Sequence, residues 1–201
     1  MRQPLKLLLV AAALTLVGAV DTVHGQDGLF ESPDGPEAVK VYYTPDEALA
    51  KVYAKADTLW AEEWVPTPSE RSELENRLGW VVADKSFVVH RGSHKGQDQG
   101  YAMILEEQGR FKPITFIVKL GTDLRVEMVL VMVYRESRGD GVKRQRFLKQ
   151  FRDKDGSDHL RLNRDIVAVS GATMSSRALA TGVKKALAIL EMKYAPTGGG
   201  S

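Results

Sequence analysis

The chain has 201 residues, of which 43% are hydrophobic and 27% charged, a composition typical of one globular domain with a sizeable core. It contains no cysteine, which excludes disulfides, Cys-ligated zinc, iron–sulfur clusters and CxxC redox chemistry. If the protein handles electrons, an organic cofactor must carry them. The formal net charge is only +2.

The first 25 residues resemble a signal peptide. A short basic start with Arg2 and Lys6 precedes an apolar run over residues 7–20, and Val23 and Gly25 suit a cut before Gln26. The alternative is an uncleaved anchor, although the run is short for a membrane span. In both cases we expect the rest of the chain outside the cytoplasmic membrane, in the periplasm or otherwise extracytoplasmic. Residues 195–201 read as a flexible tail.

Residues 26–79 are predicted to form an N-terminal helical part. Thr44, Pro45 and Glu47 make a capping box with proline at the first helical position, and apolar residues then recur at helical spacing as far as Trp60. A second, shorter helix is predicted to begin at Ser69.

After Gly79 the hydrophobic period changes, and strands are predicted over residues 85–90, 100–106, 114–120 and 126–134. The last of these is apolar on both faces apart from Glu127, so we expect a central strand covered on both sides. A short helix should follow within residues 135–164, and a final helix should run over residues 175–192. Residues 80–194 therefore predict an α+β domain with a mainly antiparallel sheet packed against helices.

Few residues suggest metal or hydrolytic chemistry. Two of the four histidines, His90 and His94, are four apart, but we expect them in a solvated Gly-rich turn after a strand rather than at a metal. The sequence has no HExxH, no GxSxG and no phosphate loop. We assign neither a metal site nor catalytic residues.

A hydroxyl cluster stands at the predicted start of the last helix, where the chain reads Ser-Gly-Ala-Thr-Met-Ser-Ser over residues 170–176. A helix N-terminus favours phosphate, and Gly171 and Ala172 add little bulk. A phosphate could esterify Thr173, with the helix amides and the hydroxyls of Ser175 and Ser176 holding its oxygens. The alternative is a plain helix cap.

This segment resembles the flavinylation motif of FMN-binding domains, a family that includes the C subunit of the Na⁺-translocating NADH:quinone oxidoreductase and the G subunit of the Rnf complex. The Glu136–Gly139 turn after a strand resembles a second family feature, and the resemblance extends over residues 101–190. It implies that an FAD:protein FMN transferase attaches FMN through its phosphate to Thr173. The other implied cofactor-binding residues are Ser170, Gly171, Ala172, Ser175, Ser176, Glu136 and Ser137.

Two positions depart from the family pattern. Val167 stands where an aspartate is usual, and Asp165 is the nearest acid. Ser137-Arg138 stands where Thr-Pro is common, and Arg138 could pair with a flavin or phosphate oxygen.

We expect an extracytoplasmic electron-transfer flavoprotein rather than a stand-alone enzyme, because the sequence has neither a dinucleotide fingerprint nor an obvious acid–base pair. Its partner would be a membrane or exported redox protein. Two alternatives stay open: a flavin-free accessory domain of a membrane redox complex, and a small flavin-dependent reductase.

The charges are distributed unevenly. Residues 26–79 hold twelve acidic and five basic residues, whereas residues 135–164 hold ten basic and five acidic ones. This asymmetry predicts that the basic stretch docks an acidic partner, with two solvated faces as the alternative. Nucleic acid is excluded as a partner, because the stretch lacks interleaved aromatic residues and the chain is expected to be exported.

Overall fold

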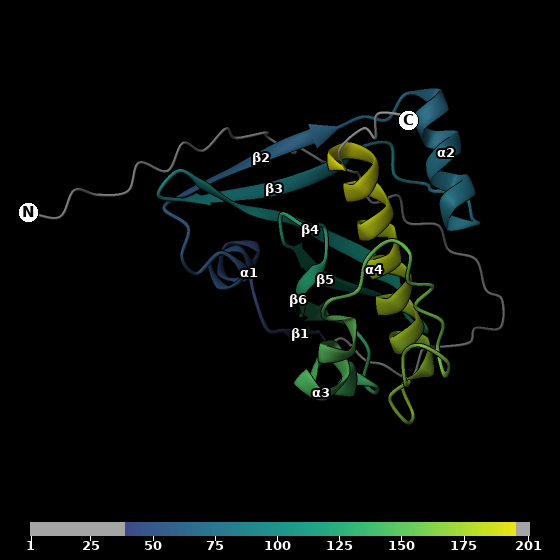
Figure 1. Ribbon diagram of the computed structural model, residues 1–201. Helices are drawn as coiled ribbons and strands as arrows, with labels where there is room; N and C mark the ends of the chain where they lie inside the picture. The colour runs from purple at the N-terminus through teal and green to yellow at the C-terminus, as the bar shows by residue number, and fades with distance from the viewer. Residues whose placement is uncertain (1–38, 196–201) are drawn as a thin grey trace, which may run out of the picture.

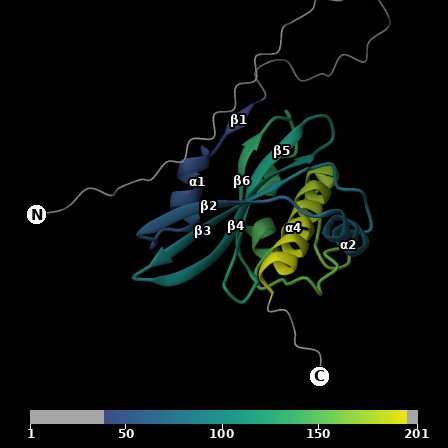
Figure 2. The ribbon, with the colours of Figure 1, turned by 90° about the horizontal axis from the view of Figure 1, so that it is seen from above.

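The computed structural model describes residues 39–195, which form one antiparallel sheet with helices on both faces (Figures 1 and 2). The strands are β1 (Lys40–Val41), β2 (Thr58–Trp64), β3 (Phe87–His94), β4 (Gln97–Gln108), β5 (Pro113–Leu120) and β6 (Val126–Tyr134). The α-helices are α1 (Pro45–Val52), α2 (Pro68–Leu78), α3 (Gln145–Leu148) and α4 (Thr173–Tyr194), and the short 3₁₀ turns are η2 (Asp140–Lys143) and η3 (Lys149–Phe151). The proposed signal peptide lies outside the described residues.

The six strands follow the order β1-β6-β5-β4-β3-β2, and every neighbouring pair is antiparallel. The prediction of an α+β domain with a mainly antiparallel sheet is therefore confirmed. Strand β6 is covered on both faces as expected, but it lies next to the edge of the sheet, because only the two residues of β1 pair beyond it. Within residues 39–195, no helix is both long enough and apolar enough to cross a membrane.

Helices α2 and α4 cover one face of the sheet and α1 covers the other (Figure 2). The inner side of α4 buries Leu179, Val183 and Leu187 in the larger core. On the opposite face, Ala48 of α1 and the neighbouring Tyr53 pack in a smaller core. Each fully buried aliphatic side chain stabilises the fold by about 1.5–3 kcal/mol. Because α4 is fixed along its whole length, its N-terminus is held at a defined place above the sheet.

The predicted helix from Pro45 to Trp60 is wrong in its second half. Helix α1 starts with the predicted capping box, since Thr44 and Glu47 exchange both bonds, but it ends at Val52. Residues Thr58–Trp64 instead pair along β3 as β2. This edge strand is partly exposed on both faces, so its side chains show no clear alternation, and pairing with β3 overrides local periodicity.

Two further boundaries differ from the predictions. Helix α2 begins at Pro68, one residue before the expected Ser69, because Thr67 and Glu70 form a second capping box. Strand β3 continues to His94, so His90 and His94 lie on a strand rather than in a loop. Burial lowers the pKa of His90, and His94 lies 3.7 Å from the carboxylate of Asp57.

Candidate functional site

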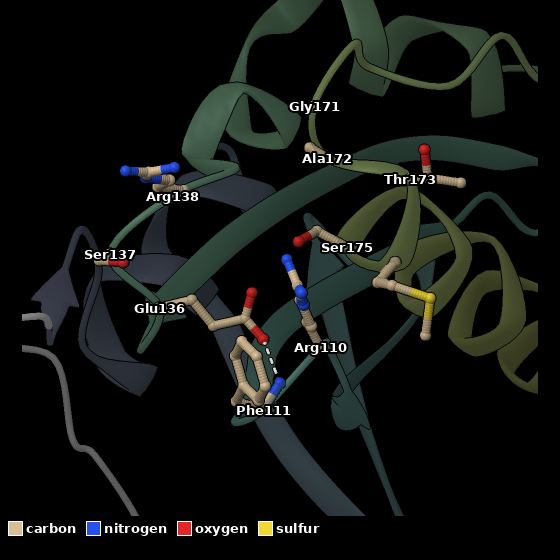
Figure 3. A pocket seen from close by; sticks show the side chains of 10 residues that line it. Arg110, Phe111, Glu136, Ser137, Arg138, Gly171, Ala172, Thr173 and Ser175 are labelled. Carbon is tan, nitrogen blue, oxygen red and sulfur yellow. Dashed lines mark hydrogen bonds between the residues drawn. The ribbon is translucent and has the colours of Figure 1, made fainter. Parts of the chain in front are cut away.

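A pocket of about 780 Å³ opens where three segments meet, and its volume is in the range of small-molecule sites (Figure 3). The β4–β5 hairpin turn contributes one wall, the turn after β6 the second, and the start of α4 the third. The lining residues are Arg110, Phe111, Glu136, Ser137, Arg138, Gly171, Ala172, Thr173, Met174 and Ser175. The structure therefore brings the Glu136–Gly139 turn and the hydroxyl motif to one place.

Close packing between Gly139 and the motif holds these two segments together. Gly139 has φ +92°, and a Cβ there would lie 2.6 Å from the Tyr134 hydroxyl and 3.2 Å from both Ala172 Cβ and Ser175 Oγ. Those separations leave no room for a side chain, and the left-handed backbone itself favours glycine. The small side chain of Ala172 also permits this close approach to Gly139.

A hydroxyl relay joins the same segments. The Tyr134 hydroxyl donates to the Arg138 carbonyl at 2.6 Å and lies 2.9 Å from Ser175 Oγ. Because Tyr134 has one proton and a carbonyl can only accept, Ser175 must donate to Tyr134. Burial raises the pKa of Tyr134 to about 12, so the phenol stays protonated at neutral pH. Ser175 therefore donates its hydroxyl proton to Tyr134, even though Ser175 itself lines the pocket.

Glu136 anchors the hairpin wall. Its carboxylate is buried, with 5% of the residue exposed, and its Oε1 accepts from the backbone N–H groups of Phe111 at 2.8 Å and Lys112 at 3.3 Å. These bonds fix the turn that carries Arg110 and Phe111. Figure 3 shows the Arg110 side chain projecting between Glu136 and the first turn of α4.

The N-terminus of α4 has no side-chain cap. Ala172 is the N-cap residue, and no side chain accepts from the first-turn amides, so the alternative of a plain hydroxyl cap does not describe this helix. Thr173 occupies the first helical position and is exposed. Gly171, with φ +74° and open space around it, turns the chain into the helix. Amides without intrahelical partners and the positive end of the helix dipole therefore face the pocket beside the Thr173 hydroxyl.

Six of the eight predicted site residues line the pocket, and two do not. Ser170 is exposed outside the lining. Ser176 is fully buried, and its Oγ accepts from the Val169 N–H at 3.0 Å, so it supports the loop before α4 rather than reaching the pocket.

Three lining residues were missed by sequence reasoning: Arg110, Phe111 and Met174. Met174 stands within the hydroxyl motif but was given no role, whereas Arg110 and Phe111 belong to no motif and reach the pocket only through the tertiary fold. One available signal was a large aromatic residue, Phe111, in a polar turn, where it remains 49% exposed.

Asp165, the acid nearest in sequence to Val167, does not line the pocket. Val167 is 71% exposed, and its backbone N–H and C=O are both bonded to the side chain of Gln150. The Asp165 carboxylate instead accepts from the Arg161 N–H at 2.8 Å, a bond that lowers its pKa.

The donor set of the pocket fits a flavin mononucleotide. Two arginines, Arg110 and Arg138, and the uncapped amides of α4 suit a phosphate, while Phe111 and Met174 offer apolar surface for a ring system. Glu136 is the one acidic lining residue. In the described part of the chain, no three His, Cys, Asp or Glu side chains are grouped to hold a metal ion.

The family comparison agrees with this chemistry. No curated protein matches the sequence. The crystal structure of NqrC from Shewanella oneidensis aligns with a TM-score of 0.47 and 17% identity, covering 68% of this chain and 80% of that one. Residues 109–188, which include every lining residue of the pocket, match the FMN-binding domain family. The match supports FMN as the cofactor and confirms that the segment that builds the pocket resembles an FMN-binding domain.

Proposed function

We propose that this protein is an extracytoplasmic electron-transfer flavoprotein whose FMN is esterified through its phosphate to Thr173. The observation that carries the proposal is the exposed Thr173 hydroxyl at the first position of an uncapped helix, in a pocket inside the segment that matches the FMN-binding domain. The extracytoplasmic location rests on the signal-peptide character of residues 1–25.

Thr173 is the attachment residue in this proposal. Its Oγ1 loses a proton and bonds to the flavin-side phosphorus of FAD, the phosphoanhydride bond breaks, and AMP leaves. An FAD:protein FMN transferase performs the step. The first-turn amides of α4 would hold the phosphate oxygens, and Arg110 would add positive charge on the opposite wall.

The bound flavin would supply one- and two-electron redox chemistry. The lining residues of the pocket would bind and orient it. Glu136 is already engaged by two backbone N–H groups, and the Tyr134 hydroxyl is engaged with Ser175 Oγ and the Arg138 carbonyl. This arrangement favours a carrier that exchanges electrons with a membrane or exported redox partner over an enzyme that protonates a second substrate.

The test is covalent loading. The mature protein, co-produced with the transferase, should show a flavin absorption spectrum and retain flavin fluorescence on a denaturing gel. Thr173→Ala should lose the gel fluorescence. The matched control is Thr122→Ala, which removes an exposed threonine outside the pocket and should leave loading unchanged. Equal fluorescence from Thr173→Ala would exclude the assignment.

A further inference from the structure

The outer edge of β6 is paired at its two ends but not between them. At one end, Val126 N–H donates to Lys154 C=O at 2.9 Å and Asp153 N–H donates to Val126 C=O at 2.8 Å. At the other end, Met132 C=O accepts from Tyr42 N–H at 2.8 Å. Within residues 39–195, the outward backbone groups between these points have no backbone partner. Such an edge is a template for a further strand.

This unpaired stretch lies at the bottom of a groove of about 250 Å³. Residues 126–130 form its floor, Lys51 of α1 stands on one side, and the α3–η3 segment stands on the other. Figure 1 shows α1 and α3 on either side of the β1–β6 edge. Strand β1 already occupies the next part of the same edge, so the groove continues the line of an existing strand.

The rim of the groove is basic. Lys51, Lys149 and Arg152 are exposed, and none of them forms an ion pair with another described residue. The one acid in the lining, Glu127, is paired with Lys119 at 2.8 Å. Arg152 Nε also donates to the Glu127 carbonyl at 3.4 Å, which places its positive charge directly beside the open edge.

We propose that this groove binds a short, extended, acidic segment of a partner protein, which adds to β6 as a strand in line with β1. Main-chain hydrogen bonds to β6 would provide affinity, and carboxylates facing the three basic side chains would provide selectivity. From Val126 to Met132 the strand spans about 20 Å, which leaves room for about five residues. The bonds at either end of the gap limit the guest strand to that length.

The occupant is a partner rather than the chain's own leader. Strand β1 enters the edge at Tyr134, the end away from the groove, and runs toward Met132 before the chain leaves for α1. The described start of the chain therefore lies at the end of β1 that is farther from the groove. The inference does not depend on a flavin, and its test can be run on Thr173→Ala protein.

The probe is a blocked pentapeptide, Glu-Glu-Val-Glu-Glu, which presents carboxylates on both faces of the added strand and is titrated into the isotope-labelled mature protein at low salt. We expect the amide resonances of residues 127–131 to shift, and hydrogen exchange to slow at those N–H groups that face the open edge. Two control peptides separate the contributions. Lys-Lys-Val-Lys-Lys tests charge, and the acidic peptide with N-methylated backbone amides keeps the charge but loses the N–H donors of the ladder. Both should bind about tenfold more weakly or worse.

The protein variants test the rim. Lys149→Glu combined with Arg152→Glu, and separately Lys51→Glu on the other wall, should each weaken binding about tenfold. Lys85→Glu makes the same charge change at an exposed site outside the groove and should have little effect.

Three results would overturn the proposal. One is no binding of the acidic peptide, and another is equal binding of its N-methylated form. The third is a marked gain in peptide affinity when residues 26–38 are removed from the mature protein, because the chain's own leader would then be the occupant.

Discussion

At the scale of single residues, the pocket depends on the close approach of Gly139 to Ala172 and Ser175. We predict that Gly139→Ala destabilises the fold by more than the roughly 1 kcal/mol that left-handed backbone strain alone costs, since its Cβ would also collide with the Tyr134 hydroxyl. Gly96→Ala is the matched control, because Gly96 has φ +77° with nothing within 4 Å. Urea unfolding measures both, and equal losses would show that the contact is unimportant.

The phenol of Tyr134 gives a pH-dependent prediction at the same scale. Burial raises its pKa from 10.0 to about 12, so its stabilising contribution is complete below about pH 10 and is lost as pH rises through about 12. Tyr134→Phe should lower the free energy of unfolding by about 1 kcal/mol at neutral pH. The difference between wild type and variant should shrink above about pH 10. A difference that stays constant through that range would contradict the assignment.

Residue identity alone predicted part of the site. The segment from Gly171 to Thr173 was recognisable because glycine, alanine and a hydroxyl at a helix start form a local pattern. Arg110 and Phe111 were not recognisable in this way. They reach the pocket only because Glu136, which is distant in sequence, bonds to their turn. Contacts of that kind are set by the sheet register and leave no local pattern.

At the scale of elements, Glu62 on β2 fastens the C-terminal end of α4 to the sheet. Its carboxylate accepts from Tyr194 at 2.8 Å and pairs with Lys193 and Arg91. Burial tends to raise the pKa of Glu62, but these hydrogen bonds outweigh burial and hold it at about 2, below the ordinary 4.5. The ionised carboxylate of Glu62 therefore joins β2 to α4, and protonation of that carboxylate in acid should weaken the connection.

Glu62→Gln should reduce the free energy of unfolding by about 1 kcal/mol at neutral pH, a modest figure because the site is partly solvated. A lowered pKa stabilises the fold above about 4.5, and that contribution disappears as pH falls through about 2. Wild type and variant should thus converge in acid, as followed by urea unfolding at several pH values. Parallel curves from neutral pH to about pH 2 would show that Glu62 contributes nothing through its charge.

The elements themselves were predictable where the periodicity was strong. Strand β6 and helix α4 have long apolar faces, and both were predicted within a few residues. Strand β2 was not predicted, because it is an edge strand exposed on both faces, and its charged and aromatic residues do not alternate with apolar ones. Its conformation is decided by pairing with β3, a contact that local sequence does not encode.

At the scale of the whole molecule, the basic stretch from Arg135 to Arg164 borders the pocket and should attract an acidic partner. Electron transfer to the native partner should slow as salt rises, because the Debye length falls from about 10 Å at about 0.1 M to about 3 Å at about 1 M. Stopped-flow mixing at increasing salt measures the association rate. A salt-independent association rate would show that this basic stretch is a solvated surface that does not attract the partner.

Reversing the charge of individual basic side chains tests which part of the surface attracts the partner. Lys143, Arg144 and Arg146 are all exposed, but Lys143 is paired with Asp140 at 3.2 Å. Arg144→Glu with Arg146→Glu is therefore the cleaner variant, with Lys143→Glu added afterwards. The association rate should fall while flavin content stays unchanged, and Lys85→Glu should leave both unaltered. Normal kinetics in the double variant would exclude these side chains from docking.

The central claim is that Thr173 carries the flavin, and the intact mass of the denatured mature protein tests it most directly. After co-production with the transferase, each wild-type chain should be heavier by one FMN less one water, and Thr173→Ala should have its unmodified mass. Thr173→Ser should retain part of the addition, because a hydroxyl remains. An unmodified wild-type chain, or a Thr173→Ala chain that keeps the added mass, would contradict the account.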